Sequence, residues 1–317
     1  MRSLLPRRGG ARRTAALLLT SAALALSPLA GAGSANATLP VDRLEDTGCL
    51  SVDTGAGATE ARGGHGLDHP EVSPAEQRAI EARTAAILKT KRQNGAATLA
   101  SVTVPVYVHV MRDTAGNGDV TDAQIRAQIR ELNENFAGGE SSEAAETEFT
   151  FTLAGTFRYN NDAWHQDKQS TKYRKETRKG GMDALNMWLV DFGYLGIATF
   201  PWSGNTDIDG IRVHYDSLPG GSIENFNLGK TATHEAGHWF GLYHTFQGGC
   251  SAKNDLVEDT PAQASPTSGC PIGRDSCEDP GLDPIHNYMD YSWDSCYNQF
   301  TPGQSTRMSD MWTAYRA

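Results

Sequence analysis

The stretch THEAGHWFGLYHTFQGGC, Thr233 to Cys250, holds three of the nine histidines of this 317-residue chain. His234 and His238 are four residues apart, so on a helix both imidazoles project from one face, about 6 Å apart along the axis. Catalytic zinc sites usually take three protein ligands and leave a fourth position open. The spacing therefore predicts a helix that presents two zinc ligands, and it calls for a third ligand nearby.

Gly241 explains how His244 becomes that third ligand. Glycine has no Cβ and readily takes the left-handed conformation that ends many helices. In an uninterrupted helix His244 would lie another turn and a half along, away from the metal. We therefore expect the chain to turn at Gly241, so that His234, His238 and His244 hold one zinc ion.

Glu235 lies beside a ligand and is poorly placed to bind the metal itself. Zinc lowers the pKa of a bound water molecule to about 7, and a carboxylate within hydrogen-bond reach can take its proton and pass it to a leaving amine. Glu235 is thus predicted to be a general base. H-E-x-x-H alone is a weak motif, but the added Gly241 and His244 make it specific. The alternative is a core helix or a closed structural zinc site, and three nitrogens without a cysteine argue against it.

The flanking segments predict a sheet and two further helices. Alternating residues over Val102–Val110 indicate a strand, and further strand-like segments cover residues 149–157, 185–192, 197–200 and 211–215. Thr121 can cap a helix with an apolar face formed by Ile125, Ile129, Leu132 and Phe136. Thr301, Pro302 and Gln304 can start a last helix, whose apolar stripe consists of Met308, Met311, Trp312 and Tyr315.

Residues 1–37 have the pattern of a secretory signal peptide. Five arginines precede an apolar run from Ala15 to about Leu26, and the small residues Ala35 and Ala37 form a cleavage site. The apolar run is shorter than the roughly 20 residues that a membrane span needs, and Pro28 follows it. We expect secretion with no membrane anchor after processing, by either the general secretory or the twin-arginine route.

The remainder of the chain is acidic. Loss of residues 1–37 removes five arginines and no acidic residue, which changes the formal net charge from −10 to −15. Such a protein is a poor partner for nucleic acid and has surplus carboxylates for Ca²⁺. Residues 38–100 are rich in Ala, Gly and acidic residues and are predicted to be a pro-segment or linker. Ser73 starts one helix in this segment, and Lys91-Arg92 is a candidate processing site.

A methionine turn extends the zinc motif into a family pattern. HEAGHWFGLYH matches the H-E-x-x-H-x-x-G-x-x-H pattern of the metzincin metalloproteases, which also require a methionine beneath the metal. NYMDYSWDSC places Met289 at 45 residues after His244. Together with VPVYVHV, LNMWLV, DLVEDTPAQ and QFTPGQSTRM, these motifs show that the chain resembles the pappalysin and cytophagalysin family of secreted zinc endopeptidases over about residues 101–317.

The resemblance implies roles that residue spacing could not assign. Met289 is implied to support the site without binding metal, and Tyr291 to stabilise the oxyanion of the tetrahedral intermediate, packing beside the site being the alternative. Four of the five cysteines lie in the last 68 residues, where an oxidising compartment favours two disulfides. The cysteine pattern of the family implies the pairs Cys250–Cys277 and Cys270–Cys296, one of three pairings that four cysteines allow.

Two acidic positions suggest further binding sites. The loop NDLVEDTPAQ carries Asp255, Glu258 and Asp259, oxygen ligands that suit Ca²⁺, and related proteases hold structural calcium near this point. We expect a calcium site at Asp255 and Asp259, a solvated acidic loop being the alternative. Asp294 lies where the family lines the pocket for the residue after the scissile bond. A carboxylate there would favour Arg or Lys, whereas an exposed turn aspartate, the alternative, would have no such role.

Cys49 is the cysteine without a partner in the proposed pairing. A thiolate is a good zinc ligand, so a cysteine in a removable segment could occupy the open metal position and keep the precursor latent. The surrounding DTGCLSV departs from the arginine-containing pattern of relatives that use such a latch. The latch therefore needs a test of its own.

Together these features predict a secreted zinc endopeptidase with an α+β fold, made as a latent precursor. The expected catalytic domain, residues 101–317, has a metzincin-like zincin fold. Its upper part, about 101–244, has a twisted, mixed, mostly parallel sheet with two long helices, and its lower part, about 245–317, is small, irregular and disulfide-stapled and ends in a helix. We expect a monomer that acts on proteins or peptides. A silent zinc-binding module and a metalloamidase are the alternative functions.

Overall fold

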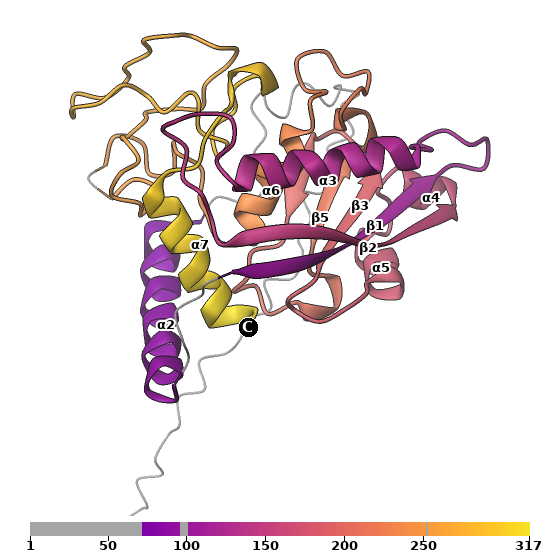
Figure 1. Cartoon of the computed structure of the whole chain (residues 1–317), viewed down its shortest axis with the longest axis horizontal. Coiled ribbons are helices and arrows are strands. Elements are labelled where there is room, and N and C mark those ends of the chain that lie inside the picture. Colours follow the sequence, from indigo (N-terminus) through magenta and orange to yellow (C-terminus); the bar gives the residue numbers. More distant parts are fainter. Residues whose placement is uncertain (1–71, 96–100, 252) are drawn as a thin grey trace, which may run out of the picture. The chain divides into compact units, whose positions relative to one another are not determined.

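The computed structural model describes residues 72–95, 101–251 and 253–317 of the chain (Figure 1). The predicted signal peptide and Cys49 lie outside these residues. The described residues belong to the unit that spans Leu44–Ala317. No helix among them is long and apolar enough to cross a membrane.

A five-stranded sheet forms the upper part of the described structure, within residues 101–244. In spatial order its strands are β2 (Phe149–Asn160), β1 (Val102–Arg112), β3 (Leu185–Val190), β5 (Ile211–His214) and β4 (Gly196–Ala198). The first four run parallel, and the edge strand β4 runs antiparallel to β5. This confirms the predicted mixed, mostly parallel sheet. Every residue of β3 is buried, as is usual for a central strand of a parallel sheet with helices on both faces.

Helices cover both faces of the sheet. α3 (Asp122–Phe136) and α6 (Lys230–Trp239) share one core with the inward-facing valines of β1, and Figure 1 shows α3 along that face. α3 begins with a capping box at Thr121 and buries the predicted apolar face. The short helices α4 (Asp162–His165) and α5 (Ser170–Thr177) pack on the other face, where the second core cluster lies. Of the two long helices expected in the upper part, α3 has 15 residues and α6 has 10.

The lower part contains little regular structure before its last helix. One-turn 3-10 helices occur at η1 (Thr206–Ile208) and η2 (Tyr215–Ser217) in the upper part, and at η3 (Asp294–Cys296) in the lower part. Two disulfides join Cys250 to Cys277 and Cys270 to Cys296, which are the pairs that the family resemblance implies. The chain ends in α7 (Pro302–Tyr315), which starts with the expected capping box at Thr301.

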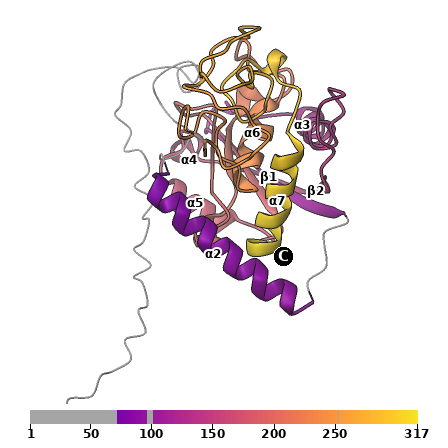
Figure 2. The same cartoon turned by 90° about the vertical axis from the view of Figure 1, so that its left-hand side faces the viewer.

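An N-terminal helix packs against α7. α2 (Pro74–Gln93) begins with the predicted capping box of Ser73 and Glu76. Its buried Thr84 lies 2.8 Å from the Tyr315 hydroxyl, and Glu81 accepts from Arg307 at 2.7 Å. α2 and α7 lie side by side in Figures 1 and 2. The helix predicted within residues 38–100 is therefore in direct contact with the last helix of the chain.

Candidate active site

The motif predicted to bind zinc begins on α6 and continues past the end of this helix. α6 stops at Trp239, and Gly241 takes the left-handed conformation with a φ of 98°. The Gly241 amide donates to His238 O at 2.8 Å, and the Leu242 amide donates to Gly237 O at 3.0 Å. These two bonds form a Schellman motif, which reverses the chain direction at the helix end. The turn predicted at Gly241 is thus confirmed.

His234, His238 and His244 meet at this turn. Their Nε2 atoms lie 3.1 Å apart between His234 and His238, 3.0 Å between His238 and His244, and 3.3 Å between His234 and His244. Two nitrogens bound to one tetrahedral zinc at about 2.0–2.1 Å are about 3.3 Å apart. All three rings are buried. The structure therefore brings the three predicted ligands together at a spacing that suits zinc.

Hydrogen bonds of the other ring nitrogen support this assignment. Nδ1 of His234 donates to Tyr288 O at 2.6 Å, and Nδ1 of His238 donates to Leu242 O at 2.8 Å, because a carbonyl oxygen can only accept. In the neutral rings the two Nε2 atoms therefore turn lone pairs toward each other, which is unfavourable unless a cation lies between them. The donor set fits a zinc ion.

A second cluster of metal-ligating groups occurs in the described part of the chain. Its members are Cys270, His286 and Cys296. The two cysteines form a disulfide, so their sulfurs are not available as thiolate ligands. The three-histidine cluster is therefore the candidate metal centre.

Glu235 lies against the edge strand of the sheet. Its side chain is fully buried. A Cβ built on Gly196, the first residue of β4, would come within 2.3 Å of the Glu235 carboxylate. Only a glycine leaves room for the carboxylate at this point. Gly196 is not among the residues predicted from the sequence, because a glycine next to a short strand gives no sign of which distant side chain approaches it.

Met289 packs against α6 at Gly237, between His234 and His238. A Cβ on Gly237 would come within 2.4 Å of its sulfur. The amide of Met289 donates to the side chain of Asn287, and Asn287 exchanges two hydrogen bonds with Gln304 of α7, at 2.8 and 3.1 Å. The methionine turn is therefore anchored to α7.

Tyr291 is also close to the histidines. Its ring centroid is 4.8 Å from that of His244 and 5.7 Å from that of His234. The side chain is buried, and its backbone amide donates to Asp290 Oδ1 at 2.8 Å. Burial raises the pKa of the Asp290 carboxyl. Tyr291 thus borders the site, in a position compatible with either of the roles considered for it.

Asp294 is buried next to the segment that leads into α6. Its Oδ2 accepts from the Leu228 amide at 2.9 Å, and its own amide donates to Asn225 O at 2.9 Å. The exposed turn aspartate considered as the alternative is therefore not what the structure contains, since only 1% of Asp294 is exposed. The carboxylate is held in a fixed position beside residues 225–228.

The two aspartates of the expected calcium site have different surroundings. Asp259 caps α7, accepting from the Thr301 hydroxyl at 2.7 Å and from the Gly303 amide at 2.8 Å. Asp255 is fully buried, and burial raises the pKa of its carboxyl to about 8. Its Oδ1 accepts from the Val257 amide at 3.1 Å, and a hydrogen bond from the Thr260 side chain partly opposes the rise in pKa.

Comparison with known proteins places these features in a family. The sequence model of one peptidase family, Peptidase_M43, described as pregnancy-associated plasma protein-A, matches residues 160–313. An extracellular metalloprotease of Pyricularia oryzae is 50% identical over 231 residues, which cover 70% of this chain and 79% of that protein.

The fold is similar to that of mirolysin from Tannerella forsythia. Mature mirolysin in complex with a cleaved peptide is 28% identical, with a TM-score of 0.59, and the similarity covers 68% of this chain and 96% of that chain. A promirolysin mutant is 27% identical, with a TM-score of 0.61, and the similarity covers 74% of this chain and 89% of that chain.

Proposed function

This chain belongs to the M43 peptidase family, that of pregnancy-associated plasma protein-A, and from this premise we propose that it is a secreted zinc-dependent endopeptidase with Glu235 as its general base. The observation that carries the proposal is the convergence of three buried imidazoles next to that buried carboxylate. Relatives named extracellular metalloproteases support secretion and a protein or peptide substrate.

In this mechanism His234, His238 and His244 hold the zinc ion through Nε2. When bound, the ion supplies Lewis-acid chemistry, polarising a peptide carbonyl and acidifying water. Glu235 takes the proton of the attacking water and returns it to the leaving amine. Its contact with Gly196 holds the carboxylate in a fixed place at the sheet edge. Such fixation matters because proton transfer needs heavy atoms within hydrogen-bond distance.

We assign Tyr291 to the oxyanion of the tetrahedral intermediate. The position of its ring beside His244 supports this role. A phenol donates one hydrogen bond, and such a bond strengthens as negative charge develops on the carbonyl oxygen. Tyr291 would thus act mainly on the rate of the chemical step.

Asp294 is assigned to the pocket for the residue after the scissile bond. Its burial and its bond to the Leu228 amide support the presence of a fixed negative charge next to the segment before α6. An arginine or lysine side chain that reached this carboxylate would form a charge-assisted hydrogen bond. The enzyme would then cut preferentially before basic residues.

The precursor is proposed to be latent, with Cys49 as a zinc-binding latch. The resemblance to a promirolysin structure supports the existence of a precursor. Cys49 lies outside the described residues, so its role rests on thiolate chemistry alone. A Cys49→Ser precursor should be active before processing. A precursor that stays as latent as the wild type would rule out the latch.

A structural calcium ion is proposed near Asp255 and Asp259. The support is the deep burial of the Asp255 carboxyl, since a buried carboxylate charge is costly unless a cation offsets it. The role of Asp259 at the start of α7 places this loop against the C-terminal helix.

The test compares the wild type with Glu235→Ala, each purified after secretion and incubated with a mixture of denatured proteins. Every new N-terminus is then sequenced. Glu176→Gln, an exposed substitution on α5 across the sheet, is the matched control. Cleavage by the wild type and the control but not by Glu235→Ala is expected, with Arg and Lys enriched after the cut.

Two outcomes would contradict parts of the proposal. Absence of cleavage by the zinc-loaded, processed wild type would refute the endopeptidase and favour the amidase or the silent module. Equal cleavage before leucine and before arginine would refute only the role of Asp294, because the other steps do not depend on that pocket.

A further inference from the structure

The turn between the second and third histidines rests on α7. A Cβ built on Gly241 would come within 2.7 Å of the Met311 side chain. The absence of a side chain at Gly241 thus serves two purposes, the left-handed backbone and the close approach of α7. Any force that fixes this turn also fixes the position of His244 relative to His234 and His238, because the turn is the covalent link between them.

Arg307 of α7 binds the turn at one carbonyl. Its Nε donates to Gly241 O at 2.9 Å, and its guanidinium lies 5.0 Å from the Tyr243 ring centroid. The same guanidinium donates to Glu81 of α2 at 2.7 Å. Its side chain is 8% exposed. The contact is therefore largely shielded from water, where a hydrogen bond from a charged donor is strongest.

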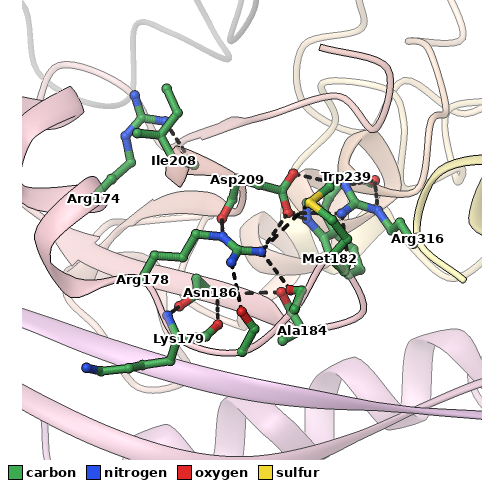
Figure 3. A network of polar contacts seen from close by, with 12 residues as sticks. Arg174, Arg178, Lys179, Met182, Ala184, Asn186, Ile208, Asp209, Trp239 and Arg316 are labelled. Atoms are coloured by element: carbon green, nitrogen blue, oxygen red, sulfur yellow. Dashed lines mark hydrogen bonds and ion pairs between the residues drawn. The ribbon is translucent and has the colours of Figure 1, made fainter. Parts of the chain in front are cut away.

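Arg316, just after α7, binds the end of α6 at another carbonyl. Its Nε and Nη2 donate to Trp239 O at 3.1 and 2.7 Å, and its guanidinium lies 3.5 Å from the Trp239 ring centroid. Asp209 accepts two bonds from the same guanidinium, at 2.9 and 3.2 Å, and a third from the Trp239 indole at 2.9 Å. Figure 3 shows this carboxylate beside Trp239 and Arg316.

The carbonyls of Trp239 and Gly241, which the two arginines bind, need hydrogen-bond donors from outside the helix. The last carbonyls of a helix have no amide to bind within it, and the C-terminal end carries partial negative charge. In α6 the Schellman bonds use the carbonyls of Gly237 and His238, and the imidazole of His238 uses that of Leu242. The two arginines provide donors for Trp239 and Gly241. Cations at this end are also favoured by the helix dipole.

We propose that Arg307 and Arg316 are positioning residues that hold the turn from Trp239 to Tyr243, so that His244 stays in place to complete the metal site. The inference rests on the proposed assignment of the three histidines as zinc ligands. At this turn the two arginines bind backbone carbonyls and not the histidine side chains. Both act through the backbone, and loss of either should loosen the third ligand while leaving the pair on α6 in position.

The experiment measures metal binding. Arg307→Met, Arg316→Met and Arg307→Lys are prepared in the full secreted protein, and apo protein is titrated with Zn²⁺ against a chelator and with Co²⁺, whose visible spectrum reports ligand number and geometry. Arg92→Met is the matched control, because Arg92 also joins α2 to α7, through Asp310 at 2.8 Å, without touching the turn. His244→Ala is the reference for a lost third ligand.

We expect each Met variant to weaken zinc binding about tenfold or more and to shift the cobalt spectrum toward that of His244→Ala. Arg307→Lys should recover part of the affinity, since an ammonium can still donate to Gly241 O. Arg92→Met should bind zinc as the wild type does. Thermal unfolding of each apo variant verifies that it is folded.

Unchanged zinc affinity and cobalt spectrum in folded Arg307→Met and Arg316→Met would overturn the inference. An effect of Arg92→Met as large as that of Arg307→Met would also overturn it, because it would point to general loosening of the α2–α7 contact. If His244→Ala itself left both readouts unchanged, the ligand assignment in the proposed function would be wrong, which is a distinct result.

Discussion

Glu235 and Gly196 illustrate how one missing methyl group can shape an active site. The carboxylate occupies the space where any other residue at Gly196 would place its Cβ. Gly196→Ala must therefore displace either the glutamate or strand β4. Because small misplacements of a catalytic group cost rate rather than binding, we expect kcat to fall about 10²-fold, with zinc content unchanged. Steady-state kinetics and metal analysis measure both, and wild-type kcat in the variant would contradict this account.

Tyr291 offers a second test at the residue scale. Phenylalanine keeps the ring against His244 and removes only the hydroxyl. If that hydroxyl stabilises the oxyanion, Tyr291→Phe should lower kcat about 10²-fold and leave KM nearly unchanged, because the hydrogen bond matters most in the transition state. A rise in KM alone would show that Tyr291 binds substrate, and unchanged kinetics would leave it a packing residue.

At the scale of elements, the contacts of α2 lead us to predict that this helix stays with the mature enzyme. Lys91 and Arg92 occupy its last turn, where Lys91 donates to Ala317 O and Arg92 pairs with Asp310, both at 2.8 Å. A protease needs an extended, accessible peptide, so cleavage there requires α2 to unfold locally. We therefore expect the processing cleavage to lie on the N-terminal side of Val72. The carbonyl of Val72 accepts a hydrogen bond from the Gln247 side chain. Mass spectrometry of the mature enzyme should detect residues 74–93; an N-terminus after Arg92 would contradict this.

β1 carries a buried histidine that links stability to pH. Burial lowers the pKa of His109 to about 4, whereas its bond to Asn186 opposes this shift. In the unfolded chain His109 becomes protonated below about pH 6.5. In the folded chain it stays neutral until the pH falls to about 4. Stability should therefore fall as the pH drops through this window, by about 3 kcal/mol at most from this residue.

The measurement is the free energy of unfolding of the apo protein between pH 4 and 7, compared between the wild type and His109→Gln. Glutamine can keep a hydrogen bond to Asn186 but does not titrate. We expect a shallower pH dependence in the variant, whatever its absolute stability. Parallel curves for the two proteins would show that His109 is not the group responsible.

At the scale of the whole molecule, disulfides and hydrogen bonds stabilise the irregular lower part. Its loops are joined by two disulfides and by Asp259 at the start of α7. If calcium also binds near Asp255, zinc alone should restore only part of the thermal stability lost in EDTA, and zinc with calcium should restore all of it. Full recovery with zinc alone, measured by the unfolding temperature, would remove calcium from the account.

What could be predicted from the sequence was local in the chain. The spacing of His234 and His238, the turn at Gly241 and the capping boxes at Ser73, Thr121 and Thr301 involve residues at most a few positions apart. Helix geometry and backbone conformation act over the same short range, so the order of residues alone is enough to identify these features. The largely apolar run that begins at Leu185 likewise indicated a strand, and the structure contains it as β3.

The tertiary structure decided which distant residues support that local motif. Arg307 reaches Gly241 across 66 residues and Arg316 reaches Trp239 across 77, and the fit of Gly196 to Glu235 joins the sheet edge to α6. No periodicity marks such contacts, because packing brings them together only when the whole core forms. The sequence was thus sufficient to propose the metal ligands and the base, whereas the residues that hold them in place could be identified only from the fold.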